Sequence, residues 1–190
     1  MALLLILLGY VVGAVPTGYL FGKLFFGIDI TKQGSGNIGA SNVARVLGKR
    51  YFFLIMFIDA LKAFGLLVLG YRLGLPAWAL YAAMATLLVG NGYSVFLRFS
   101  GGKGVATAFG IMLFALPAII AAIFVACWAL LIALTKKPFM ASLGAMLTVL
   151  VCLGCWKAWD ALWLMLAIAG WLLWRHRTNL TAWCSAKGST

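Results

Sequence analysis

The sequence predicts an all-α integral membrane protein, and three observations support this fold class. Of its 190 residues, 65% are hydrophobic and only 9% are charged, whereas soluble domains carry about 25% charged residues. The apolar residues gather in runs of the length that crosses a bilayer. The 15 Lys and Arg, against three Asp and Glu, fall mainly in short polar segments between these runs, which favours anionic lipids or substrates over nucleic acid.

The apolar runs define the expected helices in chain order. The first covers 2–26 and is interrupted near Pro16 and Gly18, because proline removes a helical hydrogen bond. Residues 27–50 form the longest polar segment. The remaining runs are 51–71, 76–97, 104–115, 118–134, 139–156 and 159–174.

The number of spans depends on residues 104–134. One continuous helix there gives six spans, whereas a break near Pro117 gives seven, with a fourth helix of about 12–14 residues that is short for a ~30 Å bilayer core. With seven spans, twelve of the Lys and Arg share one side and only Arg72 and Lys157 lie on the other. The positive-inside rule therefore favours seven, with the N-terminus outside and the C-terminus cytoplasmic. We expect one membrane domain over residues 1–190.

A glycine-rich basic loop at 98–107 is the first candidate site. Gly101, Gly102 and Gly104 lack a Cβ, so their backbone can bring several N–H groups to one anion. Lys103 adds a positive charge, and the helix expected from Val105 would add its N-terminal dipole. The spacing is not that of a Walker loop. A simple basic turn at the membrane surface is the alternative interpretation.

The polar segment at 34–49 is the second candidate site. Small hydroxyl and amide side chains lie among glycines and are followed by Arg45, a combination suited to an oxyanion pocket. The polar side chains are Ser35, Asn37, Ser41 and Asn42. Ser41 or Asn42 could also cap a short helix that contains Arg45.

Two further groups of polar residues stand out. His176 is the only histidine, and it shares a helical face with Asn179 three residues later. A basic stop-transfer end is the alternative there. Asp59 and Lys62 lie within the 51–71 run at i, i+3, where charges are costly and usually paired. We expect this pair to be structural rather than a proton relay.

These stretches together resemble one family of membrane enzymes. The sequence is similar to the bacterial acyl-phosphate-dependent glycerol-3-phosphate acyltransferases, the PlsY family, over nearly its whole length. The similarity rests on four groups of residues: Pro16-Thr-Gly-Tyr-Leu-Phe-Gly-Lys23; Gly34-Ser-Gly-Asn-Ile-Gly-Ala-Ser-Asn42 with Arg45 and Gly48-Lys49; Asp59 with Lys62; and Phe96, Gly101-Gly-Lys-Gly-Val-Ala-Thr107, Gly110, Arg175-His-Arg177 and Asn179.

The resemblance implies seven transmembrane helices in the bacterial cytoplasmic membrane and a site facing the cytoplasm. It implies transfer of a fatty acyl group from acyl phosphate to glycerol 3-phosphate, giving lysophosphatidic acid and phosphate, as the first step of phospholipid synthesis. No metal, nucleotide or obligate protein partner is implied. The implied catalytic residues are Ser35, Arg45, Lys103, His176 and Asn179; the implied substrate contacts are Gly36, Asn37, Ser41, Asn42, Gly101, Gly102, Gly104, Thr107 and, more weakly, Ser142.

The proton-transfer step stays open at this point. His176 could take the hydroxyl proton, or an oxygen of the acyl phosphate could take it while the pocket stabilises the oxyanion. A covalent acyl-Ser35 intermediate is less favoured, because no carboxylate is placed to orient a histidine base.

The chain departs from the family pattern at several positions. Asn91 and Ser94 stand where the family usually has His and Pro, and the family's final Gly-x-Glu is absent. These departures make a non-catalytic lipid-binding relative one competing function. A small anion or organophosphate transporter is the other, because a basic inner mouth would also serve it. Against the transporter, the sequence has no repeated halves and no second polar site on the outer side.

Overall fold

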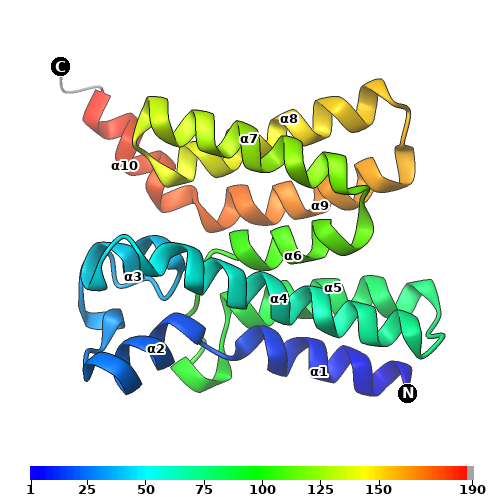
Figure 1. Ribbon diagram of the computed structural model, residues 1–190, viewed down its shortest axis with the longest axis horizontal. Coiled ribbons are helices and arrows are strands. Elements are labelled where there is room, and N and C mark those ends of the chain that lie inside the picture. Colours follow the sequence, from blue (N-terminus) through cyan, green and yellow to red (C-terminus); the bar gives the residue numbers. More distant parts are fainter. Residues whose placement is uncertain (188–190) are drawn as a thin grey trace. The chain divides into compact units, whose positions relative to one another are not determined.

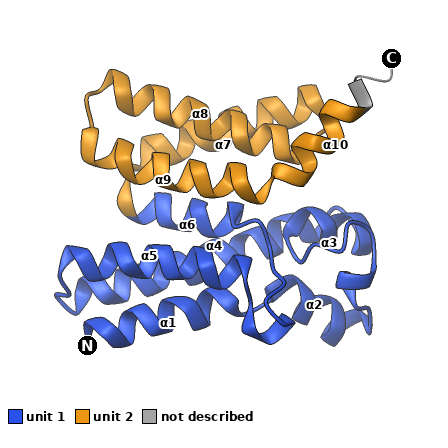
Figure 2. Ribbon diagram, turned by 180° about the vertical axis from the view of Figure 1, so that it is seen from behind, with its two compact units in different colours: residues 1–114 blue, residues 115–190 orange. Residues whose placement is uncertain are grey.

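The computed structural model describes residues 1–187, and helices account for nearly all of them (Figure 1). Within this range there are ten α-helices, two 3₁₀ turns and one isolated β-bridge, with no strand. The all-helical prediction is thus confirmed. The helices form two compact units, residues 1–114 and 115–190 (Figure 2).

The first unit contains the polar segment and the glycine loop. Its elements in chain order are α1 (Ala2–Ala14), α2 (Thr17–Phe26), η1 (Ile30–Lys32), α3 (Ala40–Leu47), α4 (Tyr51–Arg72), α5 (Ala77–Gly92), η2 (Val95–Leu97) and α6 (Val105–Ala115), whose last residue lies across the boundary. The second unit contains α7 (Ala118–Thr135), α8 (Pro138–Cys155), α9 (Trp159–Arg175) and α10 (Arg177–Lys187).

Prolines set the helix breaks, as predicted. The first apolar run is bent by 45° between α1 and α2, at Pro16. The run at 104–134 divides at Pro117 into α6, of 11 residues, and α7. Two expectations were wrong. The helix expected over 76–97 ends at Gly92 and is followed by a turn. The expected helices end with the run at 159–174, but residues 177–187 form a further helix, α10.

Glycines allow the helices of the first unit to approach closely. A Cβ at Gly13 of α1 would collide with the carbonyl group of Leu87 in α5, and one at Gly90 of α5 would collide with that of Tyr10. A Cβ at Gly110 of α6 would likewise collide with the Ala60 carbonyl of α4. In a membrane, lipid tails are as apolar as the helix surfaces, so no hydrophobic force drives the helices together. Close packing of this kind holds them instead.

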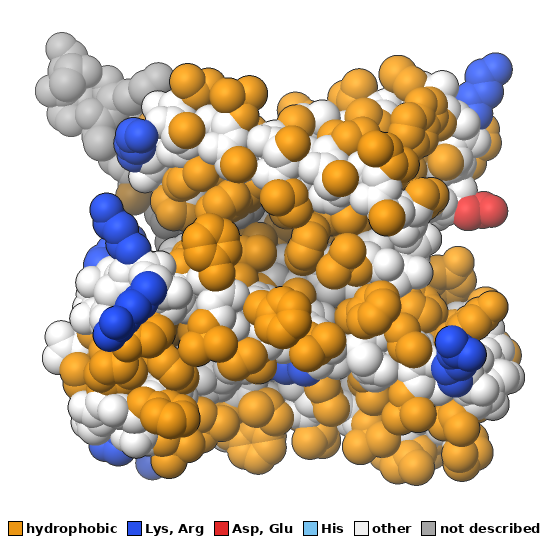
Figure 3. Space-filling view, in the orientation of Figure 1, with side chains coloured by type: hydrophobic (Ala, Val, Ile, Leu, Met, Phe, Trp, Pro, Cys, Tyr) orange, Lys and Arg blue, Asp and Glu red, His pale blue; other side chains and the backbone are white. Residues whose placement is uncertain are grey.

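Three helices of residues 1–187 are long and apolar enough to cross a membrane: α4, α7 and α8. The bent pair α1 and α2 would make a fourth, and α5 and α6 are shorter apolar helices. Hydrophobic side chains dominate the face drawn in Figure 3, where Lys and Arg are few. Many large apolar side chains are exposed, among them Leu24 at 75% and Phe53 at 71%, as expected for a membrane protein.

Candidate active site

The polar loop between α2 and α3 is shaped by glycines and by Asp29. Gly27 ends α2 in the left-handed conformation, and Gly34 and Gly36 also have positive φ values of 58° and 69°. The Asp29 carboxylate accepts hydrogen bonds from the backbone N–H and the hydroxyl of Thr31, at 3.0 and 2.6 Å, and so starts η1. These bonds from Thr31, with the nearby Lys32 and Lys23, lower the pKa of Asp29 below its ordinary 3.8.

Asn42 organises this loop from its inner side. The residue is only 1% exposed, and its side-chain amide donates to the carbonyl groups of Ile30 and Gln33, at 3.1 and 3.0 Å. Its Oδ1 accepts the backbone N–H of Ser35 at 2.8 Å. A Cβ at Gly34 would collide with the same oxygen. Asn42 thus fixes the backbone from residue 30 to residue 35 as one shaped turn.

The capping prediction for α3 was wrong. Gly39, not Ser41 or Asn42, occupies the N-cap, and the N-cap position makes no side-chain capping bond. Instead, Asn37 closes a turn just before the helix, because its Oδ1 accepts the Gly39 N–H at 2.9 Å. Asn42 lies inside α3, where its side chain turns towards the preceding loop. The amide nitrogen of Asn42, its only side-chain donor group, donates to two carbonyl groups, and its Oδ1 can only accept. The predicted anion contact of Asn42 stays a prediction.

Ser35 and Arg45 are exposed on this framework. The Arg45 guanidinium lies 3.4 Å from Asn42 Oδ1, so one buried amide contacts both the Ser35 backbone and the Arg45 side chain. A hydroxyl and a guanidinium held close together suit the oxygens of a phosphate monoester. Ser41 and Gly36 are also exposed here.

The glycine loop follows α5 through a strained turn. Ser94 and Ser100 form the isolated bridge, and Arg98 and Phe99 between them both have positive φ, 51° and 62°. Gly101 and Gly102 lie against Asn91, where a Cβ at Gly101 would collide with the Asn91 carbonyl oxygen. α6 then begins at Val105, as predicted, after Gly104 with φ 85°.

One N–H group of the predicted anion cradle is used within the loop itself. The Gly102 N–H donates to the Asn91 carbonyl at 2.8 Å, so it serves the loop's own closure. Gly101 and Gly102 are required for close backbone approach, and only Gly104 of the three needs a positive φ. Of the two cations of this loop, Arg98 is exposed and Lys103 is half-buried.

One contact joins the two loops of the first unit. Asn37 Nδ2 lies 3.5 Å from the Gly101 carbonyl oxygen, a long hydrogen bond across 64 residues of sequence. The segment with Ser35 and Arg45 and the loop with Lys103 are therefore neighbours. Thr107, another predicted contact, is fully buried, and its hydroxyl has no hydrogen-bond partner among the described residues; Asn91 Oδ1 is in the same state.

The other predicted site residues belong to the second unit. His176 lies between α9 and α10 and is 3% exposed. Its Nδ1 is 2.8 Å from the Leu172 carbonyl oxygen, which can only accept, so Nδ1 carries the proton and Nε2 is the ring's acceptor. The backbone N–H of Asn179 donates to the His176 carbonyl at 2.9 Å, which fixes these two residues in one turn.

Ser142 packs between helices of the second unit. It is buried, donates to the Pro138 carbonyl at 2.9 Å and accepts the indole N–H of Trp128 at 3.2 Å. Its hydroxyl therefore ties α8 to α7. Its predicted substrate contact remains a prediction.

The chain is similar to known proteins over nearly its whole length. A family model described as glycerol-3-phosphate acyltransferase matches residues 3–186. A glycerol-3-phosphate acyltransferase of Rubrobacter xylanophilus is 39% identical over 183 residues, which cover 94% of this chain and 89% of the relative.

Two crystal structures of PlsY (YgiH), an integral membrane glycerol 3-phosphate acyltransferase, are also similar. The lysophosphatidic acid form is 33% identical with a TM-score of 0.85, and the glycerol 3-phosphate form is 31% identical with a TM-score of 0.86. Each comparison covers 97% of this chain and 92% of the other.

Proposed function

The chain belongs to the glycerol-3-phosphate acyltransferase (PlsY) family, and from that premise we propose that it uses acyl phosphate as donor. In the proposed reaction the 1-hydroxyl oxygen of glycerol 3-phosphate attacks the acyl carbonyl carbon. The bond between that carbon and the phosphate oxygen then breaks, and lysophosphatidic acid and inorganic phosphate leave. Both substrates carry phosphate groups, which accounts for a site rich in Arg, Lys and small polar donors.

The observation that carries this proposal is the Asn42-centred loop of the first unit. It presents Ser35 and Arg45 together and lies beside the loop of Lys103. A related protein has a crystal structure in a glycerol 3-phosphate form, and these donors are suited to that ligand. We assign Ser35, Arg45 and Lys103 to phosphate binding, with Gly36, Asn37 and Ser41 as further contacts.

We assign the acyl-transfer step to His176 and Asn179. In the tautomer that donates Nδ1–H to the Leu172 carbonyl, the His176 Nε2 can accept a proton, so a general-base role is chemically available. The alternative base is an oxygen of the acyl phosphate itself, with the positive groups stabilising the oxyanion. The two mechanisms predict different effects of His176→Ala. Loss of a general base lowers kcat by about 10²–10⁴-fold, whereas with a substrate base the substitution would mainly alter binding.

The test is acyl transfer by the purified protein in detergent. Palmitoyl phosphate and labelled glycerol 3-phosphate are supplied to wild type, Lys103→Ala, His176→Ala and, as a control, Lys49→Ala, which removes an exposed cation outside the assigned site. We expect wild type and the control variant to release lysophosphatidic acid and phosphate in equimolar amounts. We expect Lys103→Ala and His176→Ala to lose this activity. A folded wild type without product would overturn the proposal; uptake of glycerol 3-phosphate by vesicles would then support a transporter.

We further propose a seven-span topology in the bacterial cytoplasmic membrane, with a single acyltransferase domain over residues 1–190 and α6 as the short fourth span. The distribution of Lys and Arg supports a cytoplasmic C-terminus and an external N-terminus. Cys184 is an exposed cysteine near the C-terminus. In a variant that keeps Cys184 as its single cysteine, a membrane-impermeant maleimide should label the protein only in lysed cells. In a cysteine-free background, Arg72→Cys should be labelled in intact cells. The reverse labelling pattern would mean that the chain has the opposite orientation in the membrane.

A further inference from the structure

The break between α1 and α2 leaves backbone groups that need partners. Pro16 has no N–H, and the Thr17 N–H turns back to the Val15 carbonyl at 3.0 Å instead of continuing the helix. The carbonyl groups at the end of α1 therefore lose their helical donors. Inside a membrane, where water is scarce, such groups must be satisfied by other parts of the protein.

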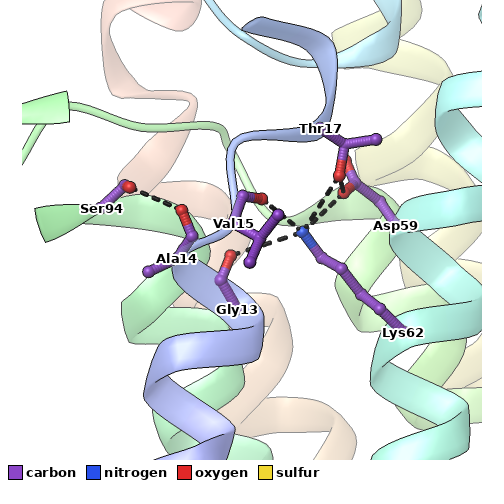
Figure 4. A network of polar contacts seen from close by, with 7 residues as sticks. All are labelled: Gly13, Ala14, Val15, Thr17, Asp59, Lys62 and Ser94. Carbon is purple, nitrogen blue, oxygen red and sulfur yellow. Dashed lines mark hydrogen bonds and ion pairs between the residues drawn. The ribbon is translucent and has the colours of Figure 1, made fainter. Parts of the chain in front are cut away.

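Two side chains from distant parts of the first unit satisfy them (Figure 4). Lys62 Nζ of α4 donates to the Val15 carbonyl at 2.8 Å and reaches the Gly13 carbonyl at 3.5 Å. The Ser94 hydroxyl donates to the Ala14 carbonyl. Three successive carbonyl groups of the break thus receive donors from outside the helix.

The same lysine also holds the far side of the break. Lys62 Nζ pairs with Asp59 Oδ1 at 2.7 Å, and that oxygen accepts the Thr17 hydroxyl at 2.6 Å (Figure 4). Thr17 is the first residue of α2. The charged pair therefore contacts the end of α1 and the start of α2 together, which fixes the angle between them.

That angle determines where the phosphate-binding loop lies. α2 packs tightly on the loop, since a Cβ at Gly18 would collide with the Ile38 carbonyl and one at Gly22 would lie 2.8 Å from the Ile30 side chain. Ile30 and Ile38 belong to the buried cluster beneath the loop. A change in the direction of α2 would therefore carry the loop with it.

Ser94 connects the break to the second loop. It precedes the glycine loop, and the neighbouring Tyr93 carbonyl accepts the hydroxyl of Tyr10 in α1 at 2.9 Å. Ser94 thus ties the segment that leads into the glycine loop to the end of α1.

We infer that Lys62 is a positioning residue: by closing the α1–α2 break together with Asp59, Thr17 and Ser94, it sets the loop of Ser35 and Arg45 against the loop of Lys103. This inference rests on the proposed function for its kinetic consequence, but its structural part can be measured without turnover. Lys62 touches no substrate in this mechanism. Its loss acts through the position of the donors, and small misplacements of such groups can cost about 100-fold in rate.

The test combines kinetics with a distance measurement. Lys62→Met keeps the length of the side chain and removes the donor; Arg72→Met, at the exposed end of the same helix, is the matched control. Nitroxide labels at Leu4→Cys in α1 and Lys49→Cys after α3, both exposed sites, report the distance across the break in a background with the native cysteines changed to Ala. The third variant, Asp59→Asn/Lys62→Met, carries no unpaired carboxylate.

We expect Lys62→Met to shift or broaden the distance distribution and to raise the KM for glycerol 3-phosphate at least fivefold, with Arg72→Met unchanged in both. The double variant should remain perturbed, because the carbonyl groups still lack a donor. An unchanged distance distribution, an unchanged KM in an active preparation, or full recovery in the double variant overturns the inference. If wild type makes no product, the proposed function fails, and the distances alone decide the role of Lys62.

Discussion

Replacing Asn42 by Ala should destabilise the loop of the proposed phosphate site. The substitution removes two donors to the Ile30 and Gln33 carbonyls and the acceptor of the Ser35 N–H, all at 2.8–3.1 Å. At about 1 kcal/mol for each hydrogen bond, the free energy of unfolding should fall by about 3 kcal/mol. The Ile30 carbonyl still accepts the backbone N–H of Gln33 at 3.3 Å, so the substitution does not leave it without a donor. SDS titration in mixed micelles, followed by circular dichroism, measures the change.

Two comparison variants separate the causes. Ser41→Ala alters an exposed neighbour in α3 and should change the free energy of unfolding by less than about 0.5 kcal/mol. Asn42→Asp keeps an oxygen for Ser35 but loses both donated bonds and places a negative charge beside Arg45. It should therefore raise the KM for glycerol 3-phosphate more than Asn42→Ala does. A loss below about 1 kcal/mol in Asn42→Ala would refute the organising role of this amide.

Three further predictions concern glycines and one acid. Gly110→Ala should lower the free energy of unfolding by about 1–3 kcal/mol, because its Cβ would collide with the backbone of α4, whereas Gly65→Ala, which faces open space, should leave it unchanged or raise it by up to about 1 kcal/mol. Gly102→Ala should raise the KM for glycerol 3-phosphate, because the new Cβ would lie 2.8 Å from Asn91 Oδ1 and would displace the loop of Lys103. Since the pKa of Asp29 is lowered in the folded loop, its carboxylate stabilises the fold above pH 3.8, and this contribution is lost as the pH falls through the lowered value. Asp29→Asn should keep an oxygen for Thr31 and lose less stability than wild type between about pH 5 and pH 3; equal losses would contradict the assignment.

The features that could be predicted from the sequence are those set by a single residue type or by simple spacing. Pro16 and Pro117 cannot continue a helix, so the breaks fall where they stand. Asp59 and Lys62 are one helical turn apart in an apolar run, and the structure pairs them at 2.7 Å. The start of α6 at Val105 could be predicted because an apolar run begins there, directly after the glycines.

The features that could not be predicted depend on contacts between distant segments. Asn42 was expected to contact an anion or to cap α3, but its side chain reaches back 9 and 12 residues to carbonyl groups that no local pattern identifies. The Gly102 N–H was expected to face a ligand, but it is taken by Asn91. One clue was available: a proline inside an apolar helix leaves carbonyl groups without donors, and Lys62 is the cation that lies well away from the ends of a predicted span.

The placement of the three acidic residues bears on the chemistry we propose. Asp59 is held by Lys62 and Thr17, Asp29 by Thr31, and Asp160 lies in the first turn of α9. Among the described residues, Arg45 contacts the neutral Asn42 amide and forms no ion pair with these carboxylates, which suits its guanidinium to an anionic substrate. We assign none of the three carboxylates to orient a histidine base. In the proposed reaction the proton of the glycerol hydroxyl passes to the His176 Nε2 or to the departing phosphate, and the size of the kcat loss in His176→Ala distinguishes the two.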